Sequence, residues 1–213
     1  MPKTWTSLTV VAALVVLAIG MSPALAASRT EYAVVRGGSE IGRHVIEVDR
    51  QGDVTQVKIA TKVQVKMAFI TVYRFEQSST ETWKSNQLVA LKSDTNDNGD
   101  EHHIAVREAA SSLRINADGK NANAEKSLLP ASLWFPATAK QRVLLNTVKG
   151  TQMRVEVADL GDDAVNAVGA RVAARHYRLA GELARDVWYD HAGRLVRLQM
   201  TGSDGSLVTY ELR

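Results

Sequence analysis

Residues 57–75 read VKIATKVQVKMAFITVYRF, and their pattern carries most of the information about the fold. Apolar and β-branched residues occupy the odd positions, whereas Lys58, Lys62 and Lys66 occupy even ones. Such alternation predicts a half-buried β-strand, because successive side chains of a strand point to opposite faces. One straight strand of this length would extend about 60 Å, which is longer than a domain of this size is wide. We therefore expect it to bend, or to be broken by a bulge, between residues 66 and 70 in a curved antiparallel sheet.

The N-terminal segment, residues 1–26, has the pattern of a secretory signal peptide. Lys3 supplies the positive charge of the N-terminal region, and residues 8–19 form the apolar region. Ala24 and Ala26 form the small-x-small cleavage site. The alternative is an uncleaved membrane anchor, for which the run is short. We expect cleavage near Ala26, no membrane span in the mature chain, and location in the periplasm or secretion from the cell. Residues 27–213 then fit a single domain.

Composition excludes several kinds of function. The 213 residues include no cysteine, so disulfides and thiol chemistry are impossible, and an exported chain without disulfides suits a bacterial envelope. The 26 Lys and Arg residues nearly balance 23 Asp and Glu, and both signs are interspersed along the chain. This balance argues against nucleic acid as a partner and against a polybasic patch for anionic lipid.

Further strands are predicted on both sides of residues 57–75. The clearest are 172–179, 183–189, 195–200 and 207–212, whose short connections require antiparallel neighbours. One short helix is expected over 138–146, next to a candidate lid that begins at Pro130. The predicted fold class is mainly β: an antiparallel, strongly curved sheet, an open half-barrel, with one short helix or lid.

Three groups of residues give a family resemblance. They are Tyr32-x-Val34 with Gly38-x-x-Ile41-Gly42, then Leu144-Leu145-Asn146-Thr147 with Gly150, and finally Tyr177-x3-Gly181-x-Leu183-x2-Asp186-x-Trp188-Tyr189-Asp190-x2-Gly193-x-Leu195-Val196. The chain resembles the exported bacterial proteins grouped as DUF6134 and, more loosely, the DUF3108 group. The resemblance implies an open half-barrel comparable to the periplasmic lipoprotein carriers, whose concave face holds acyl chains. It implies no catalytic residues.

A polar segment contains a weak calcium candidate. Asp94-x-Asn96-x-Asn98-Gly99, with Asp100 beside it, matches the first half of a calcium-binding loop. The twelfth position is Ala105 instead of the required Glu, so we favour an ordinary hairpin loop.

Histidines and catalytic motifs give no stronger site. His102 and His103 are adjacent, and neighbours in a strand point to opposite faces, so they do not share an ion. We expect neither a metal nor a cofactor. His44 shares its face with Ile46 and Val48 and is interpreted as a partly buried, hydrogen-bonded histidine. The chain has no Gly-x-Ser-x-Gly motif and no phosphate-binding glycine loop, so an enzyme is disfavoured, and a hydrolase without a recognisable motif is the least favoured hypothesis.

The favoured function is non-catalytic binding or carriage of an apolar or lipid-like ligand in the concave face of the sheet. The residues expected to contact the ligand are Val63, Val65, Met67, Phe69, Tyr73, Trp134 and Phe135. Residues 133–135 are expected to plug the open side of the sheet or, second, to act as a lid that moves to release ligand. The alternative function is an envelope scaffold or protein-interaction module with a filled interior. Ligand identity, oligomeric state and protein partners stay open.

Overall fold

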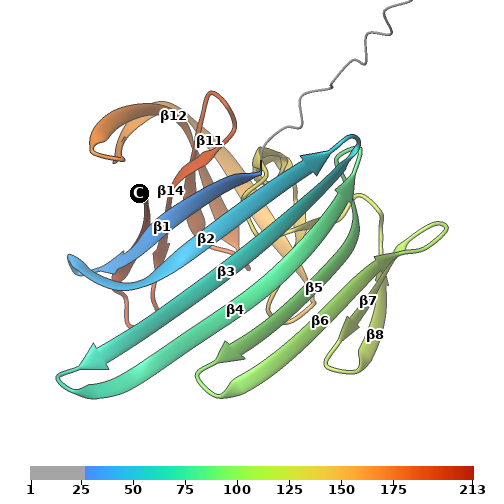
Figure 1. The fold of residues 1–213 in the computed structure, drawn as a ribbon, viewed down its shortest axis with the longest axis horizontal. Helices are drawn as coiled ribbons and strands as arrows, with labels where there is room; N and C mark the ends of the chain where they lie inside the picture. Colours follow the sequence, from blue (N-terminus) through green and yellow to red (C-terminus); the bar gives the residue numbers. More distant parts are fainter. Residues whose placement is uncertain (1–26) are drawn as a thin grey trace, which may run out of the picture.

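The computed structural model describes residues 27–213, which fold mainly as β-strands (Figure 1). The predicted signal peptide and its cleavage site near Ala26 lie outside the described residues, apart from Ala27 at their start. Residues 27–213 contain no α-helix. Accordingly, this part of the chain has no helix long and apolar enough to cross a membrane.

Fifteen strands make up the fold. The first eight are β1 (Ser28–Arg36), β2 (Ser39–Gln51), β3 (Val54–Met67), β4 (Ile70–Lys84), β5 (Gln87–Asp97), β6 (Asp100–Glu108), β7 (Leu113–Ala117) and β8 (Lys120–Ala124). The others are β9 (Leu129–Pro130), β10 (Val143–Leu145), β11 (Gln152–Ala167), β12 (Ala170–Gly181), β13 (Arg185–Asp190), β14 (Leu195–Thr201) and β15 (Leu207–Leu212). A short 3₁₀ helix, η1 (Pro136–Lys140), lies between β9 and β10.

The strands form one open sheet in the order β8 to β1, then β15 to β9. Every neighbouring pair is antiparallel except β9 and β10. The two halves meet where β1 pairs with β15, with Tyr32 opposite Leu212. Figure 1 shows β1 to β6 as a curved layer, with β11, β12 and β14 on the far side of β1. The prediction of a mainly antiparallel, curved and open sheet is confirmed.

A single core lies between the two halves of the sheet. Buried side chains from β1 and β3 belong to the same apolar cluster as side chains from β10 and β13. Val57, Leu144 and Val187 in this cluster are all fully buried. The sheet therefore wraps around one interior.

The prediction of one long strand over residues 57–75 is wrong, because the chain turns back at Ala68 and Phe69 to form the β3–β4 hairpin. Met67 pairs with Ile70 across the turn, and the register then shifts so that Val65 pairs with Tyr73. The extra residue in β4 is a bulge. It brings the odd-numbered residues of both strands to the same face, so the sequence alternation continues through the turn. The bend or bulge expected between residues 66 and 70 is instead a turn that reverses the chain, and the bulge follows it in β4.

The helix predicted over residues 138–146 is also wrong. The 3₁₀ helix η1 ends at Lys140, and Val143–Leu145 form the strand β10. Leu144 pairs with Met153 of β11 on one side and with Leu129 of β9 on the other. Pairing on both sides, with Leu144 and Leu145 fully buried, outweighs a weak local helical preference. The four strands predicted at the C-terminal end of the chain are confirmed as β12 to β15.

Candidate functional site

A cavity of about 1120 Å³ lies between the two halves of the sheet. One wall comes from β1 to β5, and the facing wall comes from residues 131–133, 146–149 and 182–185 together with β14 and β15. The lining includes exposed residues at the β3–β4 hairpin and in the turn between β14 and β15, such as Met67 and Asp204. The cavity therefore opens to solvent near these two turns.

The apolar part of the wall continues the inward face of β3 and β4. At one end of these strands, Val57 and Ile59 are buried in the core. Toward the hairpin the same face carries Val63, Val65 and Phe75, which are half-buried and line the cavity. Near the hairpin, therefore, the apolar face of β3 and β4 is not packed against the opposite half of the sheet and borders the cavity instead.

Four of the seven residues predicted to contact a ligand line the cavity, and three do not. Val63, Val65, Met67 and Tyr73 line the cavity. Phe69 does not, because it lies in the β3–β4 turn and is 100% exposed.

Trp134 and Phe135 are also absent from the cavity lining. Their rings lie 5.6 Å and 5.4 Å from the ring of Trp83 between centroids, and the two rings stack on each other at 5.4 Å. The backbone carbonyl of Leu133 accepts a 2.7 Å hydrogen bond from the Tyr189 hydroxyl. This arrangement agrees with the plug interpretation of residues 133–135, and only Leu133 of the three reaches the cavity wall.

Glu81 of β4 binds the segment 133–135 through Trp134 and is a site residue that was not among the predicted ones. Its carboxylate accepts hydrogen bonds from Nε1 of Trp134 at 2.7 Å and from Nε1 of Trp83 at 2.9 Å. Glu81 is 0% exposed, and burial raises the pKa of its carboxyl, although donors from Ser132 and the two indoles oppose the shift. A sequence signal existed, since Glu81 has the same parity as Ser79 and Trp83 on the inward face of β4.

His44 lies on the cavity wall as a buried, neutral histidine. Its Nδ1 is hydrogen-bonded to the Thr61 hydroxyl at 2.8 Å, and its ring lies between those of Tyr32 and Tyr210. Burial lowers the pKa of His44 to about 4. The prediction that His44 is hydrogen-bonded is confirmed, and its side chain is buried rather than partly buried.

Other polar residues of the cavity lining form hydrogen bonds with each other. The Tyr73 hydroxyl donates to Asp97 at 2.8 Å, and burial is the main cause that raises the pKa of Tyr73. The Gln77 amide donates to the backbone carbonyl of Thr147 at 3.0 Å. This second bond ties β4 to the segment that forms the facing wall.

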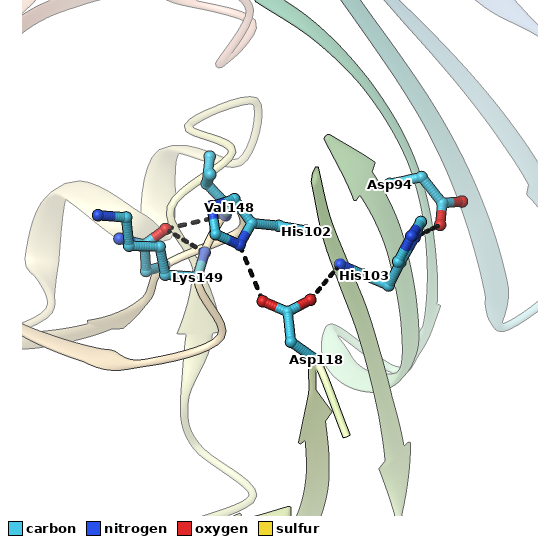
Figure 2. A network of polar contacts seen from close by, with 7 residues as sticks. Asp94, His102, His103, Asp118, Val148 and Lys149 are labelled. Carbon is cyan, nitrogen blue, oxygen red and sulfur yellow. Dashed lines mark hydrogen bonds and ion pairs between the residues drawn. The ribbon is translucent and has the colours of Figure 1, made fainter. Parts of the chain in front are cut away.

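The two adjacent histidines point to different carboxylates (Figure 2). His102 Nδ1 lies 2.8 Å from Asp118, and His103 Nδ1 lies 2.8 Å from Asp94. Asp118 also accepts the backbone N–H of His103 at 2.6 Å. Within residues 27–213, no group of three or more His, Asp or Glu side chains has an arrangement that could hold a metal ion.

The weak calcium candidate has the geometry of a hairpin. Asp94 and Asn96 belong to β5, and Asp100 begins β6. Asn98 and Gly99 make the two-residue turn, with positive φ values of 56° and 107°, and Gly99 N–H donates to the Asn96 side chain at 2.9 Å. Asp94 faces His103 instead of the turn.

Comparisons with known proteins give a family and a similar fold but no function. No curated protein matches this chain. A crystal structure described as a β-barrel-like protein of domain of unknown function DUF1849 from Brucella abortus is similar, with a TM-score of 0.64 and 12% identity over 89% of this chain and 96% of that one. The likeness shows a shared fold. The family model described as "Domain of unknown function (DUF6134)" matches residues 32–213, and the chain therefore belongs to the DUF6134 family.

Proposed function

We propose that this protein binds or carries an apolar or lipid-like ligand in the cavity, without catalysing a reaction. The observation that carries the proposal is the cavity volume of about 1120 Å³ beside an uncovered apolar strand face. Ligand sites typically measure about 300–1,000 Å³ and are lined mainly by apolar side chains. Removing Val63, Val65 and Phe75 from water would supply the binding free energy, at about 25 cal/mol per Å² of apolar area.

The cavity mouth supports exchange of such a ligand with the surroundings. Met67 and Val72 line the cavity next to the exposed tip of the β3–β4 hairpin. Ile70 and Phe69 extend the apolar surface beyond the mouth. We place the action of the protein in the periplasm or outside the cell, on the strength of the signal-peptide pattern in residues 1–26.

The test is binding of a neutral apolar fluorophore, N-phenyl-1-naphthylamine, to the mature protein. The variant Val65→Trp fills the cavity wall, whereas Val143→Trp makes the same change on β10, outside the lining. We expect the fluorophore to bind the wild type and the Val143→Trp control, and to bind Val65→Trp at least about tenfold more weakly.

Native mass spectrometry of protein purified from its own envelope gives a second readout. A co-purifying apolar molecule supports carriage. If the wild-type protein neither enhances the fluorescence nor retains any apolar molecule, the scaffold hypothesis replaces the proposal.

A further inference from the structure

Arg185 brings a positive charge into the cavity without a carboxylate to neutralise it. It is the first residue of β13, its side chain is half-buried, and it lines the cavity. Within residues 27–213, its guanidinium donates to the adjacent carbonyl of Ala184 at 2.7 Å and forms no ion pair. By contrast, Arg36 on the same lining pairs with Asp204. Arg185 therefore has donors left for a bound molecule.

The acids around the cavity are already engaged. Asp204 pairs with Arg36, and Asp97 accepts the Tyr73 hydroxyl. Glu182 accepts the backbone N–H of Arg154 at 2.7 Å. An unpaired cation in a partly buried position costs free energy, because it loses water without gaining a counter-charge. An anionic ligand group would remove that cost.

Tyr210 lines the same cavity as Arg185 and belongs to the same face of the sheet. Val187, two residues after Arg185 and on the same face of β13, pairs with Leu198 of β14, and Leu198 pairs with Tyr210 of β15. Burial raises the pKa of Tyr210, and the charge of Arg185 opposes this rise. Tyr210 also contributes to the raised pKa of Tyr73. The Tyr210 hydroxyl donates no hydrogen bond to another group among residues 27–213 and lines the cavity. It is a second donor available to a ligand.

The charge of the lining matches a headgroup with a single negative charge. The ionised side chains are four cations, Arg36, Lys66, Lys149 and Arg185, and three carboxylates, Asp97, Glu182 and Asp204. His44 is neutral at pH 7, because burial lowers its pKa to about 4. The surplus is therefore one positive charge, and a dianionic phosphate monoester would leave one negative charge unbalanced.

We infer that the ligand is an amphiphile with one carboxylate, of the long-chain fatty-acid class, held by the guanidinium of Arg185 and the hydroxyl of Tyr210. The hydrocarbon chain lies along the apolar wall of β3 and β4. Arg suits this role because its planar guanidinium binds a carboxylate through two parallel hydrogen bonds. This inference rests on the proposed function and names its ligand class.

The experiment displaces N-phenyl-1-naphthylamine with tetradecanoate, tetradecanol or tetradecyl phosphate at pH 8, below the micelle concentrations of the two anions and the solubility limit of the alcohol. The three compounds share one chain and differ in headgroup. We expect the wild type to bind tetradecanoate at least about tenfold more tightly than tetradecanol, and more tightly than tetradecyl phosphate.

Variants assign the preference to the two residues. Arg185→Gln is expected to lose about tenfold in affinity for tetradecanoate and to keep the wild-type affinity for tetradecanol. The affinity of Arg185→Lys for tetradecanoate is expected to lie between those of the wild type and Arg185→Gln. Tyr210→Phe is expected to lose less affinity for tetradecanoate than Arg185→Gln does. The control is Arg107→Gln, since Arg107 is exposed on β6 and outside the cavity lining.

The outcomes separate the inference from the proposed function. If Arg185→Gln binds tetradecanoate and tetradecanol as the wild type does, the carboxylate site is wrong and apolar binding stands. Tighter binding of tetradecyl phosphate than of tetradecanoate also overturns the carboxylate assignment. If the wild type binds neither the fluorophore nor any of the three compounds, both the carboxylate inference and the proposed function are wrong. Thermal unfolding of Arg185→Gln checks the fold, and we expect no loss of stability because the variant removes an unpaired cation.

Discussion

The indole Nε1 of Trp134 and the carboxylate of Glu81 are joined by a 2.7 Å hydrogen bond, which fixes the loop after β9 to the inward face of β4. Trp83 donates a second hydrogen bond to the same oxygen. The carboxyl group therefore accepts from the buried indole of Trp83 and from the partly buried indole of Trp134.

Two variants, Glu81→Gln and Glu81→Leu, distinguish the effect of the Glu81 charge on stability from the effect of its hydrogen bonds. Burial raises the pKa of Glu81, so its contribution to stability is present below the unfolded value of 4.5 and is lost as pH rises through the folded pKa. Glu81→Gln keeps an acceptor for both indoles and removes this loss. We expect it to unfold at a higher urea concentration than the wild type at pH 8.

Glu81→Leu is the matched variant, because it removes the acceptor and leaves two indole N–H groups unpaired. An unsatisfied buried donor costs about 1–3 kcal/mol, so we expect Glu81→Leu to be less stable than Glu81→Gln at pH 8. Equal urea midpoints for the two variants would show that these hydrogen bonds do not stabilise the plug.

His44 should make the protein sensitive to mild acid. Its folded pKa of about 4 lies below the unfolded value of 6.5, so its stabilising contribution is present above pH 6.5 and is lost as pH falls toward 4. The shift corresponds to about 3 kcal/mol when the loss is complete. We expect urea midpoints between pH 7.5 and 4.5 to fall less for His44→Gln than for the wild type. The control His191→Gln, at an exposed turn, should retain the wild-type pH dependence.

Gly42 permits the close pairing of β2 with β3. A Cβ atom at this position would collide with the Lys62 carbonyl oxygen and lie 2.8 Å from Cα of Val63. Because both neighbours are backbone atoms, the strand itself must move, and we expect Gly42→Ala to cost about 1–3 kcal/mol in unfolding free energy. The control Gly119→Asn has no atom within 4 Å of the new Cβ, and asparagine tolerates its positive φ. Similar stabilities for the two variants would contradict this view of the pairing.

Phe69 and Phe75 test the assignment of the cavity wall. Phe69 is fully exposed in the turn, whereas Phe75 is half-buried on the lining. We expect Phe69→Ser to leave the unfolding free energy within about 0.5 kcal/mol of the wild type and to retain fluorophore affinity. Phe75→Ser should weaken both. A loss of fluorophore affinity with Phe69→Ser alone would move the binding site from the cavity to the hairpin tip.

Local patterns in the sequence predict the strands well where each strand has its own alternation and its own turn. The last four strands meet this condition and lie close to their predicted positions. The β3–β4 hairpin does not, because the bulge at Val72 keeps the apolar residues on odd positions in both strands. No propensity distinguishes that pattern from one bent strand, which is why the alternation predicts a bend where the structure has a hairpin turn.

The site was predictable only as far as it depends on strand parity. Val63, Val65 and Tyr73 face the cavity because they share the parity of the core residues before them. Arg185 belongs to a different part of the sheet, and its place on the same cavity lining as Tyr210 depends on strand pairing that no spacing in the sequence encodes. The helix expected over 138–146 failed for the same reason, since β9 and β11 supply the partners that make residues 143–145 a strand.

The pairing of β1 with β15 has a consequence for how the protein is made. The strands that join the two halves of the sheet are far apart in the chain, so this central seam forms only after residues 207–212 have been synthesised. The backbone N–H of Arg213 donates to the Glu31 carbonyl at 3.0 Å, which places the start of β1 beside the end of β15. A short linker between them, with a new opening at the Asp118-Gly119 turn, should give a circular permutant in which the seam is a covalent hairpin and forms early.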